Sequence, residues 1–182
     1  MSVEARVKEL GLQVPDFAAS PYTGLKYGAV RPHRIVGSVL FLSGHMPELP
    51  DGQVFHPGAL GLDLTTEQGY EAARVAGLNA LAGIRFALGT LDRVVAVVRS
   101  LNFVVCAPGY YDIHKVTDGA TDLLVDVFGS EVGVGGRATV GVTSLARNHC
   151  FETWLTLEVD PDGAPVGGAG STVDPTDPSL GP

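Results

Sequence analysis

The chain has 182 residues, which is enough for one domain with a hydrophobic core. Hydrophobic residues make up 45% of it and charged residues 18%, which excludes a chain that is disordered throughout. The formal net charge of -8 argues against a nucleic-acid-binding surface, and no apolar run approaches the roughly 20 residues of a membrane-spanning helix. The first residues lack the basic-then-apolar order of a signal peptide, so we expect a cytoplasmic protein.

The first third of the chain predicts one short helix and one strand between irregular segments. Ser2 is a suitable N-cap for a helix over residues 2–10, and the proline-containing segment 11–26 predicts irregular structure. The apolar run 34–43 favours a strand, and residues 45–63 are rich in loop-forming glycine and proline.

The rest of the chain alternates helices with strands. Apolar residues spaced three and four apart predict two helices, and β-branched, alternating segments predict three strands. In chain order these elements are a helix over 65–89, a strand over 91–105, a helix over 111–128, a turn at 133–136 and strands over 137–142 and 150–159. In the last strand, alternation places Phe151, Thr153, Leu155 and Leu157 on one face and Glu152, Trp154, Thr156 and Glu158 on the other.

This order predicts an α+β fold in which both helices cover one face of a sheet. The other face then carries uncovered apolar residues, so we expect an oligomer to bury it. We assign the folded domain to residues 25–159 and an N-terminal helix with an irregular extension to 1–24. Residues 160–182 hold four aspartates and no basic residue among glycine and proline, which predicts a disordered acidic tail.

One arginine and one glutamate stand out as candidates for chemistry. Arg137 follows Gly135 and Gly136, and such a glycine pair allows close backbone approach to a ligand. A guanidinium can bind both oxygens of a carboxylate, and a glutamate nearby can orient or deprotonate a water. If the strands that carry Arg137 and Glu152 pair, the two side chains can share a pocket for a small acid. The alternative is structural: a surface arginine at a strand end and a solvated glutamate.

The remaining reactive side chains predict no metal site. The five histidines lack metal-ligand spacing to a cysteine or to one another. His45 suits either a proton shuttle or a loop histidine that binds backbone, and the second interpretation is favoured. Cys106 and Cys150 lie in apolar runs and are expected to be buried.

Several short segments follow one another in a distinctive order. They are 42–47 (LSGHMP), 61–65 (GLDLT), 89–94 (GTLDRV), 119–124 (GATDLL), 137–142 (RATVGV) and Glu152, with Asn79 and Phe128-Gly129 between them. In this order and spacing, over about residues 25–159, the chain resembles the RidA/YjgF enamine–imine deaminase family. It is most similar to the longer branch labelled endoribonuclease L-PSP/chorismate mutase-like.

The resemblance implies chorismate mutase-like subunits in a homotrimer, with the sheets forming an inner barrel and a cleft at each of three subunit interfaces. It implies that Arg137 binds the substrate carboxylate and that Glu152 lies near the water that attacks the imine carbon. Further substrate-binding positions implied by the resemblance are Ser43, Gly44, Tyr27, Thr121, Thr139 and His45. Of these, Thr121, Thr139 and His45 replace the family's asparagine, cysteine and glutamine, which changes the pocket but leaves the carboxylate contact intact.

The expected function is hydrolytic deamination of small 2-imino or enamine acids to a 2-oxo acid and ammonia. No cofactor is expected, because an iminium carbon is already electrophilic. The expected partner is a small carboxylate metabolite, with neither nucleic acid nor membrane. Two alternatives stay open: a trimeric module that binds carboxylates without turnover and, ranked lowest, the endoribonuclease activity in the family's label.

Overall fold

A five-stranded sheet in the order β1-β2-β5-β3-β4 organises the computed structural model, which describes residues 1–19 and 30–160. The pairs β1 (His33–Val36) with β2 (Val39–Leu42), β2 with β5 (Phe151–Val159) and β5 with β3 (Val94–Val105) are antiparallel. The edge strand β4 (Gly136–Val142) runs parallel to β3. The sheet is therefore mixed, and the predicted α+β class is confirmed.

The segment 34–43 was wrongly predicted as a single strand. It forms a hairpin in which Val36 pairs with Val39 and the chain turns at Gly37 and Ser38. Gly37 has a φ of +60°, a left-handed conformation that glycine adopts without steric cost and that two-residue hairpin turns require. Because apolar residues that suit a strand flank the Gly37-Ser38 turn on both sides, the turn was not visible in the hydrophobic pattern.

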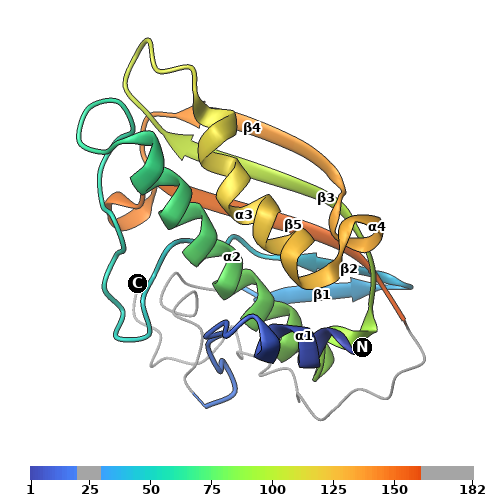
Figure 1. Cartoon of the computed structure of the whole chain (residues 1–182). Coiled ribbons are helices and arrows are strands. Elements are labelled where there is room, and N and C mark those ends of the chain that lie inside the picture. The colour runs from blue at the N-terminus through green and yellow to red at the C-terminus, as the bar shows by residue number, and fades with distance from the viewer. Residues whose placement is uncertain (20–29, 161–182) are drawn as a thin grey trace.

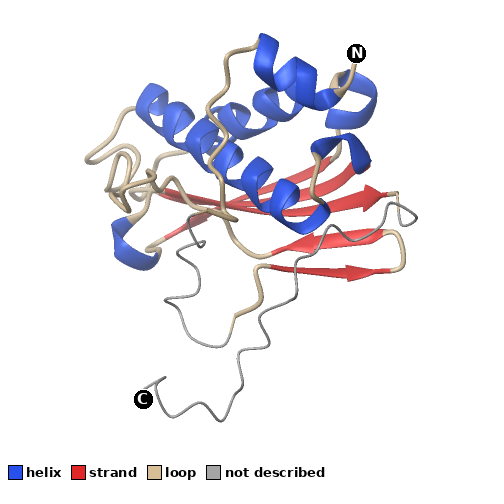
Figure 2. Ribbon diagram, turned by 90° about the horizontal axis from the view of Figure 1, so that it is seen from below, coloured by secondary structure: helices blue, strands red, loops and turns tan. Residues whose placement is uncertain are grey.

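Two long helices, α2 (Thr66–Leu88) and α3 (Ile113–Phe128), lie side by side on one face of the sheet (Figure 1). A capping box between Thr65 and Gln68 begins α2, and Gly89 ends it at a φ of +80°. Seen from below, every helix of residues 1–19 and 30–160 except the single turn η3 (Ala146–Asn148) lies on this side, and none of the other described helices covers the opposite face of the sheet (Figure 2).

Small residues bring the two helices close together. A methyl group on Gly119 of α3 would lie 2.0 Å from the carbonyl oxygen of Tyr70 in α2, so only glycine fits there. Between α3 and β4, the single helical turn α4 (Ser130–Gly133) completes the crossover that a parallel strand pair requires. The last residue of α4, Gly133, is the first residue of the turn predicted at 133–136.

The N-terminal helix α1 (Val3–Glu9) packs on the end of α2. Both oxygens of the Glu4 carboxylate accept hydrogen bonds from Arg85, at 3.1 and 2.7 Å, and Val7 is buried in the core. The strand expected from residue 91 begins three residues later, because Leu91–Arg93 form the 3-10 turn η2. The tail predicted over 160–182 lies outside the described residues, except for Asp160.

The hydrophobic core has two parts, and a polar layer lies between them. Along β3, Val97 belongs to one apolar cluster and Val104 to the other. The inward-facing residues between them are Ser100 and Asn102, and Thr153 of β5 pairs with Asn102. All three polar side chains are at most 3% exposed, so the sheet presents a buried hydrophilic band to the helices.

Candidate functional site

The structure describes all of the predicted site residues except Tyr27. Apart from His45, these residues lie in two clusters. The first, which we call the arginine pocket, is built from the edge strand β4 and from α3, around Arg137, Asp118 and Thr121. The second, which we call the glutamate cluster, comprises Glu152, Trp154, Ser43 and Gly44 where β5 meets the end of β2. Tyr27 lies outside the described residues.

In the arginine pocket, one edge of a guanidinium is fixed by α3. Arg137 Nη1 donates to Asp118 Oδ1 at 2.6 Å and to Thr121 Oγ1 at 3.2 Å. Asp118 and Thr121 are three residues apart and therefore lie on one side of the helix. Within residues 1–19 and 30–160, Nη2 and Nε of Arg137 donate to no other group. The guanidinium thus keeps one edge for two parallel hydrogen bonds to a carboxylate.

A pocket of about 270 Å³ opens beside this guanidinium. The glycine-rich segment after α4 lines one side of it, and a methyl group on Gly135 would lie 2.3 Å from the Val97 carbonyl oxygen. The Arg137 and Asp118 side chains are 33% and 40% exposed, and an ion pair this open to solvent contributes at most about 1 kcal/mol. A ligand can therefore share or replace this contact at small cost.

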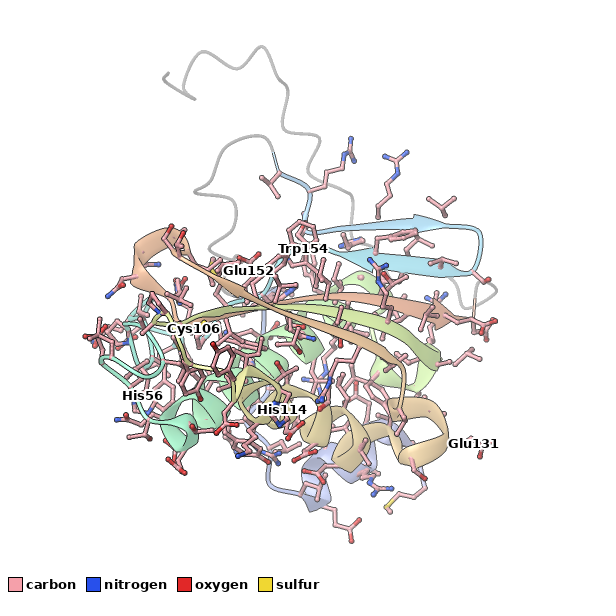
Figure 3. All side chains as sticks on the ribbon, turned by 90° about the horizontal axis from the view of Figure 1, so that it is seen from above. His56, Cys106, His114, Glu131, Glu152 and Trp154 are labelled. Carbon is pink, nitrogen blue, oxygen red and sulfur yellow. The ribbon has the colours of Figure 1, made fainter. Side chains whose placement is uncertain are left out.

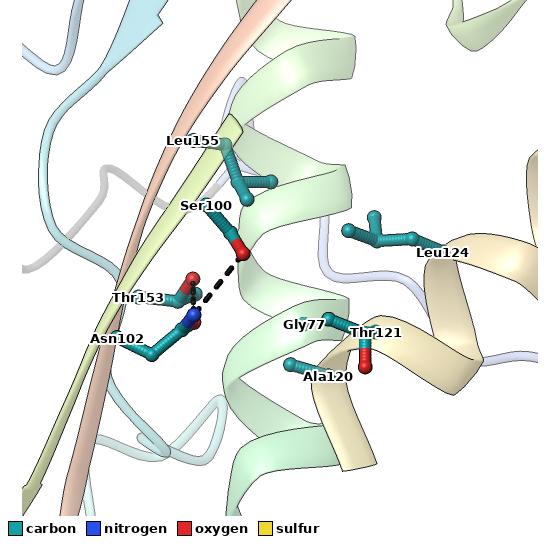
Figure 4. A pocket seen from close by; sticks show the side chains of 8 residues that line it. All are labelled: Gly77, Ser100, Asn102, Ala120, Thr121, Leu124, Thr153 and Leu155. Atoms are coloured by element: carbon teal, nitrogen blue, oxygen red, sulfur yellow. Dashed lines mark hydrogen bonds between the residues drawn. The ribbon is translucent and has the colours of Figure 1, made fainter. Parts of the chain in front are cut away.

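The polar layer of the core reaches the inner wall of the pocket. Ser100 lines the arginine pocket and also the narrower gap behind it, which Figure 4 shows between Thr121 and the sheet. Asn102 donates from Nδ2 to Ser100 Oγ at 3.0 Å and accepts a hydrogen bond from Thr153 at 2.8 Å. These bonds hold Ser100 in place, so the pocket has a rigid hydroxyl in its wall.

Thr139 lies on the same strand and face as Arg137. Its hydroxyl donates to Thr117 Oγ1 at 3.0 Å, and Thr117 is fully buried in α3. Thr139 therefore ties β4 to the helix that carries Asp118 and Thr121.

The glutamate cluster holds its acid by close packing. Trp154 Nε1 donates to Glu152 Oε1 at 2.6 Å, and Figure 3 shows the two side chains near each other on β5, on the side of the sheet away from α3. A methyl group on Gly44 would lie 1.7 Å from the same Oε1 atom, so the absence of a side chain there makes room for the carboxylate. The Ser43 hydroxyl donates to the Arg31 carbonyl and fixes the chain just before this glycine.

Arg137 and Glu152 do not face one pocket within a single chain. Their strands do not pair, because β3 lies between β4 and β5. Arg137 is aligned with Ser100, which faces the helices, whereas Glu152 is aligned with Phe103, which faces the opposite side. Neighbouring residues in register point to the same face of a sheet, so the two side chains project from opposite faces. The condition on which the predicted shared pocket depended is therefore not met inside one protomer.

His45 lies in the interior and is 1% exposed. Its Nδ1 donates to the Ser43 carbonyl at 2.8 Å, and burial lowers its pKa to about 4. Its ring fills the space above Gly83, where a methyl group would lie 2.5 Å from Nε2. His45 lines neither pocket that adjoins Thr121, and its contacts match the interpretation as a loop histidine bound to backbone.

Other ionisable side chains contact one another in the loops at the end of the sheet. Arg147 has a φ of +54°, and its Nη1 lies 2.9 Å from Glu48 Oε2, beside the buried His149. No three metal-binding side chains gather anywhere in residues 1–19 and 30–160. Cys150 is buried, which raises the pKa of its thiol to about 12, but Cys106 is only partly buried, contrary to expectation.

Two residues of these clusters were missed by the sequence reasoning. Asp118 stands three residues before Thr121, and this helical spacing was the available sign that both would face Arg137. Trp154 was placed on the same strand face as Glu152 but was given no role.

The part of the chain that the structure describes contains no helix with both the length and the hydropathy needed to span a membrane.

A family model and a curated relative each match most of the chain. A family model described as "YjgF/chorismate mutase-like, putative endoribonuclease" matches residues 4–151. Protein TCP17 of Trypanosoma cruzi is 36% identical over 158 residues, which cover 87% of this chain and 94% of that protein.

Solved structures share the fold. A structure from Shewanella oneidensis, described as a "putative endoribonuclease", is 33% identical, with a TM-score of 0.78 over 87% of this chain and 100% of that one. Atu1372 of Agrobacterium tumefaciens, of unknown function, is 31% identical, with a TM-score of 0.74 over 87% of this chain and 94% of that one. TdcF of Escherichia coli, solved with bound serine, is 16% identical, with a TM-score of 0.53 over 73% of this chain and 90% of that one. The chain belongs to the YjgF/chorismate mutase-like family.

Proposed function

We propose that the protein hydrolyses small 2-imino or enamine acids to the corresponding 2-oxo acid and ammonia. The observation that carries this proposal is the arginine pocket, in which α3 fixes one edge of the Arg137 guanidinium and leaves the other edge available beside a cavity. A fixed guanidinium fork binds a carboxylate with two parallel hydrogen bonds, which positions the adjacent carbon of the substrate.

The reaction adds one water and releases one ammonia. Water attacks the iminium carbon, and Glu152 accepts a proton from that water as the new C–O bond forms. The same carboxyl group returns this proton to the nitrogen. As the C–N bond breaks and ammonia leaves, the proton of the new hydroxyl group passes to the Glu152 carboxylate and the C=O bond of the 2-oxo acid forms. The iminium carbon is electrophilic without assistance, so we propose no cofactor.

In this proposal a second copy of the chain supplies Glu152, because Arg137 and Glu152 project from opposite faces of one sheet. The glutamate cluster of one protomer then closes the arginine pocket of the next. A closed ring of three such contacts gives three equivalent sites, as in the homotrimer that the family resemblance implies.

The uncovered face of the sheet supports this assembly. The strand register places three large apolar residues on the face opposite the helices, and each of them is 44 to 47% exposed. They are Phe41, Val140 and Trp154. Uncovered apolar side chains gathered on one flat face are typical of a subunit interface. Glu152 lies on this face as well, so the interface and the proposed site are continuous.

Mixing two inactive variants tests the shared site. Arg137→Ala and Glu152→Gln are each expected to lose ammonia release from a freshly generated imino acid. When equal amounts are unfolded and refolded together, about a quarter of the sites in random trimers combine an intact arginine with an intact glutamate. We therefore expect about a quarter of wild-type activity to return. Recovery of none, although the wild type is active, would contradict a site shared between copies, and an inactive wild type would contradict the deaminase itself.

One observation favours a second candidate, a module that binds carboxylates without turnover. The Asp118 carboxylate already neutralises Arg137, and Thr121 and Thr139 stand where the family resemblance implies an asparagine and a cysteine. Thermal stabilisation by 2-oxo acids without ammonia release from any imino acid would favour this candidate.

A further inference from the structure

We propose that Trp154 is a positioning residue for Glu152. Its indole holds one carboxylate oxygen, Oε1, and thereby leaves proton transfer to the other oxygen, Oε2. This inference rests on the proposed function, because it takes Glu152 as the group that accepts a proton from the attacking water. It adds the reason why this glutamate, rather than another carboxylate on the same face of the sheet, is suited to that task.

One hydrogen bond fixes one oxygen of the Glu152 carboxylate. Trp154 Nε1 donates to Glu152 Oε1 at 2.6 Å, and the alternation along β5 places both side chains on the same face of the sheet. An indole nitrogen can only donate, so the carboxylate oxygen must be the acceptor. Within residues 1–19 and 30–160, no group donates to Oε2, which is therefore available to a water.

Gly44 closes one side of this hydrogen-bonded pair. A methyl group on Gly44 would lie 1.7 Å from Glu152 Oε1 and 2.7 Å from both Glu152 Cδ and Trp154 Nε1. The bond therefore lies directly against the Gly44 backbone, and neither the carboxylate nor the indole can move toward that side. Oε1 is the carboxylate atom nearest to Gly44, so the oxygen that Trp154 holds is also the oxygen that is packed.

A neighbouring strand holds the indole itself. The ring of Phe103 in β3 meets the Trp154 ring edge to face, with centroids 5.5 Å apart and planes inclined at 62°. In the strand register, Phe103 is paired with Glu152 and Leu101 with Trp154. Aromatic pairs in this arrangement attract each other, so β3 orients the indole while the indole orients the carboxylate. Both side chains of the pair are therefore restricted by groups outside β5.

A second glutamate of the same strand shows what the indole contact adds. Glu158 lies on the same face of β5 as Glu152 and is exposed. No group in the part of the chain that the structure describes donates to its carboxylate. A freely rotating carboxylate must lose its conformational freedom in each proton transfer, whereas Glu152 has lost it on folding. Of the two glutamates, only Glu152 is thus oriented before the substrate arrives.

This role predicts that Trp154 affects the rate of reaction and not the binding of substrate. In the proposed function, Arg137 of the neighbouring copy binds the substrate carboxylate, and Trp154 takes no part in that contact. A loosened Glu152 should therefore lower kcat and leave KM nearly unchanged, whereas a distorted pocket would also raise KM.

Trp154→Phe tests the proposal, because it keeps an aromatic ring beside Phe103 and removes the N–H donor. We expect kcat for ammonia release from an imino acid to fall about tenfold, with KM within about twofold of the wild type. Trp154→His should recover part of kcat at about pH 8, because a neutral imidazole can still donate from Nε2. The matched control Glu158→Gln should keep kcat within about twofold, and light scattering should show the same assembly for every variant.

A double variant separates positioning from other roles of the indole. Glu152→Asp shortens the acid by one methylene and takes the carboxylate out of reach of Trp154. Adding Trp154→Phe to Glu152→Asp should then change kcat by less than about twofold. An equal loss in both backgrounds, or an unchanged kcat of Trp154→Phe alone, would overturn the proposal while leaving Glu152 as the base. An inactive wild type, or a fully active Glu152→Gln, would instead contradict the proposed function and this inference with it.

Discussion

Arg137 and Glu152 project from opposite faces of one sheet, and β3 lies between the two strands that carry them. In the function that we propose, a single chain therefore presents the carboxylate anchor on its helical face and the acid on the opposite face. Only the contact between copies that we propose brings the two groups together, which makes assembly a condition of activity.

Replacing Arg137 by lysine should abolish most of the activity, although the positive charge is retained. An ammonium is a point donor and cannot hold both oxygens of a carboxylate in register while bound to Asp118. We expect kcat/KM for imino acid hydrolysis to fall by about a hundredfold, measured by ammonia release. Arg74→Lys, whose partner Asp126 lies outside the pocket, should stay within about twofold of wild type. Equal activity of Arg137→Lys and wild type would contradict the bidentate contact.

Gly44→Ala should displace the acid without unfolding the protein. The added methyl group would lie 1.7 Å from Glu152 Oε1 and 2.7 Å from Trp154 Nε1, so both side chains must move. We expect a loss of activity of at least about tenfold, because the attacking water is no longer held in place. Since the chain has a single tryptophan, a shift of its fluorescence emission reports the displacement directly. Unchanged emission with full activity would show that Glu152 does not depend on this packing.

Charge on the uncovered face should break the assembly. Phe41→Glu places a carboxylate on an apolar residue that is 46% exposed, on the face that we assign to the interface. We expect a monomer by light scattering and loss of activity, because no second copy then supplies Glu152. Tyr111→Glu is a suitable control, since Tyr111 is 84% exposed and precedes α3 on the other side of the sheet. An active monomer of Phe41→Glu would refute the shared site.

Lowering the pH should reduce the free energy of unfolding already above the pH range in which the carboxylates become protonated. Burial lowers the pKa of His45 to about 4, and it also lowers the pKa of His33 and of His149. Between the ordinary histidine pKa of about 6.5 and these lower values, the unfolded chain binds protons that the folded chain does not. The free energy of unfolding is therefore highest above pH 6.5 and falls as the pH drops.

The slope between pH 6.5 and pH 5 measures this effect. Each such histidine contributes about 1.4 kcal/mol per pH unit in the range where only its unfolded form is protonated. Urea unfolding at several pH values should show an uptake of one to about three protons over this range. A free energy of unfolding that does not change from pH 6.5 to pH 5 would mean that these histidines are accessible to protons in the folded state.

The elements that depend on local periodicity were predictable from the sequence. Thr65 and Gly89 delimit α2 through side-chain and backbone capping, and the alternation along β5 correctly separated Glu152 from the buried Phe151. The hairpin at Gly37 was missed because apolar residues flank the turn on both sides. The resemblance to the family rested on short segments in order, and the comparisons confirm it.

The sequence by itself determined the two long helices and the alternation along β5, because helical and strand periods are local properties of the chain. It also predicted that both long helices would cover the same face of the sheet. Only the tertiary structure decided that β3 separates β4 from β5, and therefore that Arg137 and Glu152 point away from each other. Strand order depends on pairing between distant segments, which no local pattern encodes, and the same long-range packing set Asp118 against Arg137.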